Sequence, residues 1–176
     1  MLDPVDVLYD LDKLPFPFAS ECADEIIFSH VLEHFAFSDL VQLLEEARRL
    51  LKPGACMTIS VPHAGSIAAF TDPTHKTFFT FGTFYYFTQQ YRFSYYKNSV
   101  TGWETEKIWA STNIFNTQLQ RERGWQTWLN QFCSRIMNFF LRHSKDLTLP
   151  DLLAKTLPIW LINIHVSMRK ITIGEI

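Results

Sequence analysis

Residues 25–61, EIIFSHVLEHFAFSDLVQLLEEARRLLKPGACMTISV, decide the fold of this 176-residue chain. The stretch opens with a short apolar run at 25–29 and closes with another at 56–61. Both runs are rich in Ile, Val or Phe and are typical of strands buried on both faces. Residues 38–52, between them, predict an amphipathic helix. Its apolar side chains recur at helical spacing: Leu40, Val41, Leu43, Leu44, Ala47, Leu50 and Leu51.

The ends of this helix also have sequence signals. Ser38 or Asp39 is expected to cap its N-terminus with a side-chain oxygen. Glu45 and Arg49 are spaced for an i,i+4 ion pair on the solvent side. The Pro-Gly step at residues 53–54 is expected to end the helix.

A strand, a helix and a strand joined by short connections form a βαβ unit, whose two strands are parallel. Such sheets bind ligands beyond the carboxyl ends of their strands. These ends are marked by Asp10 with Leu11, by Ser29 with His30 and by Pro62 with His63. A further short strand is predicted at residues 5–9 (VDVLY), directly before the acidic loop that starts at residue 10. The fold class is therefore α/β.

The second half of the chain is rich in aromatic residues. Residues 106–109 predict part of a strand, and residues 162–171 alternate as in a half-buried, final antiparallel edge strand. Residues 125–142 predict a helix, with these apolar members: Trp128, Leu129, Phe132, Ile136, Phe139 and Phe140. We expect a single domain over 1–176, in which residues 1–81 form one half of the core and residues 82–176 complete the sheet.

Composition excludes several classes of protein. The chain is 47% hydrophobic with a net charge of -2, which argues against disorder and against a nucleic-acid footprint. No apolar run approaches the ~20 residues of a membrane span. The first residues have no basic region followed by an apolar run, so they are not expected to be a signal peptide. Three cysteines without a CxxC motif favour reduced thiols and no cysteine metal site. A cytoplasmic location is therefore expected.

Four motifs occur in order: DLDKLPFPF at 10–18, ADEIIFSHVLEHF at 23–35, LLEEARRLLKPGACMTISVP at 43–62 and DPTHK at 72–76. Together they resemble the class I S-adenosylmethionine-dependent methyltransferases, in particular the type-11 group. The resemblance implies a Rossmann-like sheet, S-adenosylmethionine as cofactor and methyl transfer to a small-molecule or glycan acceptor.

The family's glycine-rich cofactor turn has no counterpart here. The chain has 6 glycines, and none of them forms a GxG step. The resemblance therefore implies a truncated, partial sheet that lacks the first strands. It also brings S-adenosylmethionine binding into question, because a glycine-rich turn lets the backbone approach the ligand closely.

The resemblance also implies a set of cofactor-binding residues. Asp10 matches the residue whose carboxylate accepts from the adenine amine, and Leu11 matches the one whose backbone N–H reaches the ring. Ser29 and His30 match the strand end beside the methionine portion. The alternative for Asp10 is a plain turn residue.

On the acceptor side, the resemblance leaves three candidate bases: His34, His63 and His75. Methyl transfer needs positioning, and it needs a base when the nucleophile is protonated. Asp72 and His75, in DPTHK, are candidate substrate contacts. Each histidine has a structural alternative as a hydrogen-bonded residue without a chemical role.

Two other functions stay open. His30-Val-Leu-Glu33-His34 also satisfies H-x-x-E-H, a zinc-hydrolase pattern that needs both histidines on one helix face with Glu33 as base. Alternatively, the chain is a non-catalytic methyltransferase-like partner or fragment. The strand at 25–29 would then expose its edge, which predicts self-association or a partner chain at that edge.

Overall fold

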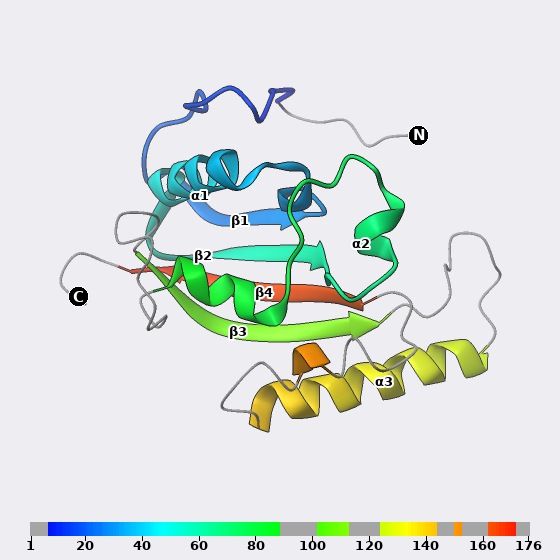
Figure 1. Cartoon of the computed structure of the whole chain (residues 1–176). Coiled ribbons are helices and arrows are strands. Elements are labelled where there is room, and N and C mark those ends of the chain that lie inside the picture. The colour runs from blue at the N-terminus through cyan, green and yellow to red at the C-terminus, as the bar shows by residue number, and fades with distance from the viewer. Residues whose placement is uncertain (1–6, 89–101, 113–123, 144–149, 153–161, 172–176) are drawn as a thin grey trace.

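The computed structural model describes residues 7–88, 102–112, 124–143, 150–152 and 162–171. Four strands form one sheet in the order β1-β2-β4-β3 (Figure 1): β1 (Ala23–Ser29), β2 (Leu51–Pro62), β3 (Trp103–Thr112) and β4 (Ile162–Lys170). β1 and β2 are parallel, whereas β4 is antiparallel to both β2 and β3. The predicted α/β class and the partial sheet are confirmed.

Helix α1 (Phe37–Leu50) connects the two parallel strands, as the βαβ pattern predicts. The predicted cap is wrong, because the N-cap is Ala36 and makes no side-chain hydrogen bond. The predicted end is also wrong. Leu51 is already extended and starts β2, so the helix ends before the Pro-Gly step, and Gly54 takes a positive φ of 74° inside the strand.

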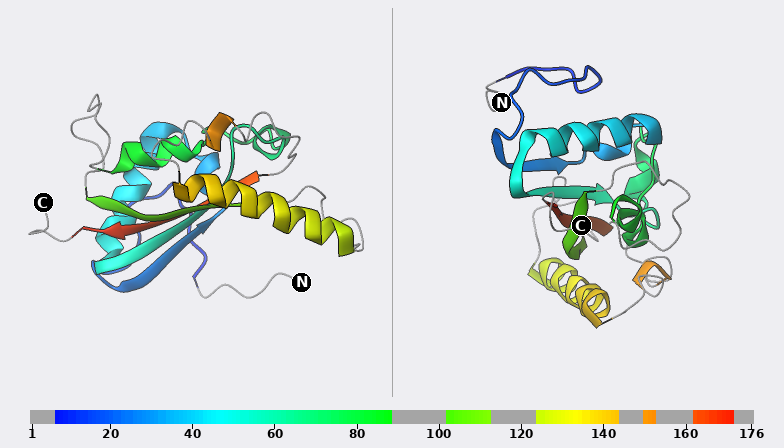
Figure 2. Two further views of the ribbon diagram at one scale, coloured as in Figure 1. Left: turned by 90° about the horizontal axis from the view of Figure 1, so that it is seen from below. Right: turned by 90° about the vertical axis from the view of Figure 1, so that its left-hand side faces the viewer.

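The core lies on one face of the sheet, beneath α1. Leu40, Leu43 and Leu44 are fully buried there. They pack with alternate residues of the two central strands: Met57, Ile59, Val61, Ile164, Val166 and Met168. Figure 2 shows α1 and α2 (Ala68–Thr71) on the same side of the sheet. The period-2 pattern of β4 therefore identified the face that it buries.

The opposite face of the sheet is polar. The Cys56 thiol donates to Glu106 over 3.3 Å, and the Ser167 hydroxyl donates to the same carboxylate over 3.2 Å. Thr58 donates to Glu25 of β1 over 3.2 Å. Doubly wound sheets are covered by helices on both faces. Here the described helices α1 and α2 cover one face only.

β4 is not the edge strand that its alternation suggests. It lies between β2 and β3, so β3 forms that edge. Helix α3 (Gly124–His143) runs along the outer side of β3 (Figure 1). The Asn138 side chain accepts from the Ala110 N–H over 2.8 Å and donates to the Ala110 carbonyl over 3.0 Å.

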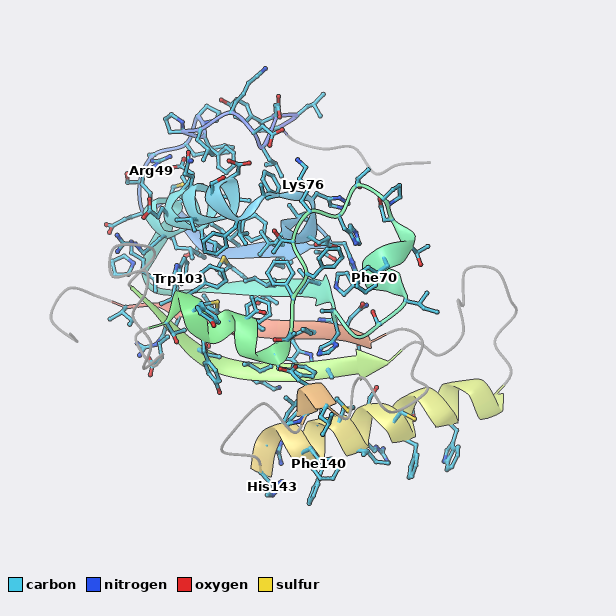
Figure 3. The ribbon with its side chains drawn as sticks, in the orientation of Figure 1. Arg49, Phe70, Lys76, Trp103, Phe140 and His143 are labelled. Carbon is cyan, nitrogen blue, oxygen red and sulfur yellow. The ribbon has the colours of Figure 1, made fainter. Side chains whose placement is uncertain are left out.

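The predicted extent of α3 is confirmed, but its buried face differs from the expected one. Met137 is fully buried, and Cys133 and Leu141 pack against the core on either side of it. Three of the predicted apolar members are exposed by about half or more: Trp128 (62%), Phe132 (47%) and Phe139 (58%). Figure 3 shows Phe140 and His143 near the C-terminal end of this helix.

The N-terminal loop, residues 7–20, is not a strand where the structure describes it. Residues 7–9 are irregular, and the start of the predicted strand at 5–6 lies outside the described residues. The loop is tied to α1 instead. Arg49 donates to the carbonyls of Phe16 and Phe18 over 3.2 and 2.9 Å, and the Phe16 N–H donates to Glu46 over 2.7 Å.

Arg49 also bonds Glu46, one turn back, over 2.6 Å and 2.8 Å, so the predicted pair with Glu45 is wrong. The guanidinium of Arg49 lowers the pKa of Glu46 below its ordinary value, although burial opposes this.

The aromatic run after DPTHK lies only partly in the core where it is described, since Phe78 (43%) and Tyr86 (45%) are exposed. Phe79, Phe81 and Phe84 are fully buried, the last two in the 3-10 helix η2 (Phe81–Phe87). The rest of the run, residues 89–96, lies outside the described residues. No helix within the described ranges is long and apolar enough to cross a membrane.

Candidate functional site

The carboxyl ends of β1 and β2 are neighbours, as the βαβ pattern predicts. Ser29 pairs with Ser60, and the His30 N–H donates to the Ser60 carbonyl over 2.9 Å. The 3-10 helix η1 (Leu32–His34) and α2 lie at this end (Figure 1). We call this part of the molecule the carboxyl rim. It is where open parallel sheets bind their ligands.

His30 turns the chain away from β1 at the carboxyl rim. Its φ of 54° is left-handed, which is uncommon for a residue with a side chain. Its Nδ1 lies 3.2 Å from Oε1 of Glu33. The Glu33 carboxylate raises the pKa of His30 above its ordinary value, although burial of the ring opposes this.

Asp10 and Leu11 lie in an exposed turn of the N-terminal loop. The Asp12 N–H donates to Oδ1 of Asp10 over 3.1 Å, and Lys13 is 3.5 Å from Oδ2. These local contacts are those of an ordinary turn. Among the described residues, no hydrogen bond connects this turn with Ser29 or His30, so the predicted adenine contacts stay a prediction.

The VLEH and DPTHK motifs come together at the carboxyl rim. His34 and His75 stack edge to face with ring centroids 4.9 Å apart. Nδ1 of His34 is 2.9 Å from Oγ1 of Thr74, whose hydroxyl donates to Oδ1 of Asp72 over 2.6 Å. Donation from the Thr74 hydroxyl and backbone lowers the pKa of Asp72. Oδ1 of Asp72, a predicted substrate contact, is therefore already engaged by Thr74.

His63 is enclosed, unlike His34 and His75. Its ring is fully buried and packs against Phe81 at 5.0 Å between centroids. The Gly65 N–H donates to Nδ1 over 2.8 Å, and Nε2 is 3.0 Å from Oδ1 of Asp151. Because both nitrogens are engaged, His63 has none left for a substrate in this structure, and its contacts are those of a structural histidine.

Of two further residues of this region, sequence reasoning named Glu33 only as the base of the H-x-x-E-H alternative and missed His165. Glu33 is 1% exposed, and its Oε2 has no hydrogen-bond partner among the described residues. His165, on the polar face of β4, pairs in register with Ser60 and bonds Ser111 over 2.7 Å. Burial lowers the pKa of His165, and nearby His30 lowers it further. The E in VLEH was a signal for Glu33, whereas nothing marked His165.

The helical premise of the H-x-x-E-H alternative is wrong. His30 takes a left-handed turn conformation, and η1 is a three-residue 3-10 helix. Residues at i,i+4 share a face only on a continuous α-helix. His30 bonds the Glu33 carboxylate directly instead of facing a shared metal with His34.

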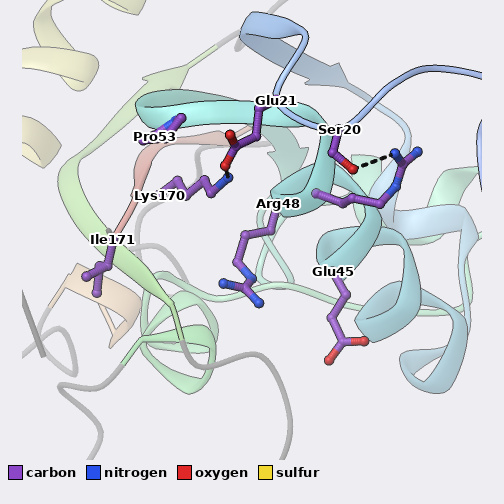
Figure 4. Close-up of a pocket in the computed structure, with 8 residues that line it drawn as sticks. Ser20, Glu21, Glu45, Arg48, Pro53, Lys170 and Ile171 are labelled. Carbon is purple, nitrogen blue, oxygen red and sulfur yellow. Dashed lines mark hydrogen bonds and ion pairs between the residues drawn. The ribbon is translucent and has the colours of Figure 1, made fainter. Parts of the chain in front are cut away.

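A pocket of about 380 Å³ lies at the other end of the sheet (Figure 4). It is lined by charged side chains from the end of α1 and of β4, including Arg48, Arg49 and Lys170. Lys170 is paired with Glu21 over 3.3 Å, and Arg49 with Glu46. Figure 3 labels Arg49 at the opposite end of the sheet from Phe70 of α2, so this pocket is separate from the carboxyl rim.

The parallel pair β1 and β2, connected by α1, is the kind of open α/β sheet that binds ligands beyond the carboxyl ends of its strands. Residues 4–59 match the family described as "Methyltransferase domain". Among curated proteins, no sequence matches the chain.

Solved structures with a similar fold include two methyltransferases. One is an S-adenosylmethionine-dependent methyltransferase from Archaeoglobus fulgidus, at 15% identity and a TM-score of 0.52, with 93% of this chain and 66% of that one covered. The other is a proposed methyltransferase from Bacillus halodurans, at 17% identity and a TM-score of 0.51, with 93% and 70% covered. The chain thus spans about two thirds of their length. The resemblance to class I methyltransferases is confirmed in the sequence of residues 4–59 and in the fold.

Proposed function

We propose that the carboxyl rim contributes to an S-adenosylmethionine site of a methyltransferase. The observation that carries this proposal is the coincidence of the family match with the rim: residues 4–59 include the N-terminal loop, β1 and the turn at His30. Asp10 and Leu11 are the proposed adenine contacts. Ser29 and His30 are the proposed neighbours of the methionine portion.

The acceptor is proposed to be a small molecule or a glycan, held on the VLEH and DPTHK side of the rim. His34 and His75 are half-buried there, and each has one ring nitrogen without a protein partner among the described residues. Asp72 supports this side through Thr74. The protein's own contribution to methyl transfer is mainly to hold the acceptor in line with the methyl group.

The open edge of β1 supports a second part of the proposal. No described strand pairs with its outer side, and Ile27 is 65% exposed. We propose that a strand from another polypeptide segment or a partner chain pairs here and supplies the glycine-rich turn. About one third of the Archaeoglobus protein has no counterpart in this chain, which supports this idea. Without that strand, the chain is a non-catalytic partner.

Calorimetric titration of S-adenosylhomocysteine into the purified chain tests the cofactor assignment. We expect binding that Asp10→Ala weakens about tenfold or more, since loss of a hydrogen bond to a charged group costs about 1.5–3 kcal/mol. The control is Asp39→Ala, which removes an exposed carboxylate on α1. Equal affinities for the wild-type chain and Asp10→Ala would contradict the adenine role.

The absence of any binding by a folded chain would have a different meaning. It would identify the glycine-rich turn as indispensable and favour the non-catalytic partner. Light scattering on the same sample then measures association at the β1 edge. A monomer with a cooperative melt and no affinity for S-adenosylhomocysteine would contradict both parts of the proposal.

A further inference from the structure

Two turns that are about forty residues apart in the sequence are fastened together at the carboxyl rim. The N–H groups of Lys76 and Thr77 both donate to the Glu33 carbonyl, over 2.8 and 3.1 Å. The Thr77 hydroxyl donates to the Phe35 carbonyl over 2.7 Å. Figure 3 labels Lys76 in the loop that passes over this end of β1. The backbone thus fixes η1 against the DPTHK loop.

The hydrogen bonds of the two histidines determine which ring nitrogen is free. The Thr74 hydroxyl donates its only proton to the Asp72 carboxylate. Its oxygen therefore accepts from Nδ1–H of His34 at 2.9 Å. Nδ1 of His75 is 2.8 Å from the Ala69 carbonyl, which can only accept. Both rings therefore carry their proton on Nδ1, and the Nε2 lone pair of each is left for a ligand.

The third member of the cluster is Glu33. Its side chain is 1% exposed, one oxygen bonds His30 and the other has no partner among the described residues. A buried carboxylate oxygen without a partner is costly. A carboxylate oxygen of Glu33 and one nitrogen each of His34 and His75 lie within 4.8 Å of one another. A cation at this point would satisfy all three groups.

We propose that Glu33, His34 and His75 bind one divalent ion of the zinc type. Imidazole with carboxylate is a donor set that zinc and similar transition ions favour over Mg²⁺ or Ca²⁺. The bonds from Nδ1 of each ring to Thr74 and Ala69 are the outer contacts that orient metal-binding histidines. Three protein ligands leave one position open, as in sites that hold a water or a substrate.

The ligand set differs from that of the H-x-x-E-H pattern. His75, from the DPTHK loop, takes the place that the pattern gives to His30. Zinc bonds of about 2.0–2.2 Å place ligand atoms roughly 3.5 Å apart, so the three side chains would close by about 1 Å through rotamer changes. The inference does not rest on methyl transfer. If the ion is bound, His34 and His75 are ligands and not bases.

Zinc titration in competition with a chromophoric chelator, in the absence of S-adenosylmethionine, tests the site. We expect one ion per wild-type chain and at least 100-fold weaker binding by Glu33→Gln, His34→Gln and His75→Gln. His143→Gln is the matched control, because His143 is exposed at the end of α3 and bonds the Phe139 carbonyl as His75 bonds Ala69. It should bind zinc as the wild type does. Mg²⁺ should not compete.

His30→Gln separates the two ligand sets. Since His30 contacts Glu33 and not the ion, we expect His30→Gln to weaken zinc binding about tenfold. That is the lower end of the range for loss of an outer contact. Loss of binding in His30→Gln with full binding in His75→Gln would overturn the proposal in favour of the H-x-x-E-H set. No one-to-one site in the wild type would overturn both.

Melting curves keep the test decisive if a variant is unstable. Zinc should raise the melting temperature of the wild type and of His143→Gln, because a ligand that binds the folded state stabilises it. It should not raise that of Glu33→Gln, whose side chain keeps the shape of the original. An equal rise in Glu33→Gln and in the wild type would contradict the role of the carboxylate.

Discussion

The outer edge of β3 is covered by a helix, whereas no described residue pairs with the outer edge of β1. The backbone N–H and carbonyl of Ala110 point away from β4, and the side-chain amide of Asn138 bonds both of them. β1 ends the strand order on the opposite side, and its Ile27, on the polar face of the sheet, is 65% exposed. Unpaired strand edges invite pairing with another chain, so natural sheets usually cover or charge them.

The difference between the edges indicates where the fold is self-sufficient. In the antiparallel half of the sheet, formed by β4 and β3, helix α3 covers the outer edge of β3. The parallel half ends at an open strand, which is also the strand that reaches the proposed cofactor site. If that edge receives another strand, the same event would complete the sheet and the site.

Met137→Ala should have the largest effect, because it removes the buried contact between α3 and the core. Met137 is fully buried, and such a truncation typically costs about 2–5 kcal/mol of unfolding free energy. Urea denaturation measures it. Phe132→Ala, on an exposed part of the same helix, should cost well under half as much. Equal costs would show that α3 is not seated on β3 through Met137.

Glu46→Gln should come next, since it weakens the anchor of the N-terminal loop beside the open edge. Hydrogen bonds to a charged group contribute about 1.5–3 kcal/mol, and Glu46 accepts from Arg49 and from the Phe16 N–H. Asp24→Asn is the control, because its pair with Lys52 is exposed and should contribute at most about 1 kcal/mol.

The effect of Glu46→Gln should depend on pH. The pKa of Glu46 is lower in the folded chain than in the unfolded one, so its contribution is complete above the unfolded value of about 4.3. It is lost as the pH falls through the folded pKa. Denaturation of the wild type and the variant should therefore differ at pH 7 and converge in acid. A gap that widens in acid would contradict this assignment.

Asn138→Ala should cost about 1–3 kcal/mol, because it leaves the N–H and carbonyl of Ala110 without a partner. Hydrogen exchange at Ala110 should accelerate as well. Gln131→Ala, an exposed change on the same helix, should alter stability by less than about 0.5 kcal/mol. Unchanged exchange at Ala110 in Asn138→Ala would mean that another group covers this edge.

Ile27→Lys should have the smallest effect on stability, within about 0.5 kcal/mol, because the side chain is mostly exposed. It should nevertheless reduce self-association measured by light scattering, since a lysine on an edge strand disfavours pairing with another chain. Unaltered association of Ile27→Lys would show that the chain does not self-associate through the β1 edge.

Local patterns predicted the βαβ unit and the buried face of β4, because periodicity reports which side of an element is apolar. They did not predict the central position of β4, which depends on pairing with distant β3. The apolar face of α3 was also missed. The helix carries apolar residues on more than one side, so their pattern does not define a single buried face. The contact of Asn138 with Ala110 fixes which side faces β3.

The candidate site was predicted in its parts and not in its assembly. VLEH and DPTHK were recognised, yet nothing local indicates that His34 would stack on His75. Glutamate is seldom buried, so composition gave no reason to expect Glu33 at 1% exposure. His63 stood out at a strand end but is enclosed, because Asp151, 88 residues away, occupies its Nε2.

Hydrogen exchange with and without S-adenosylhomocysteine tests whether the carboxyl rim is the cofactor site. If it is, we expect increased protection at residues 9–12 and 28–34 alone. Protection should be unchanged in helix α3 and at the pocket lined by Arg48, Arg49 and Lys170 at the other end of the sheet. Protection at the pocket, or at α3 without the rim, would contradict the claim.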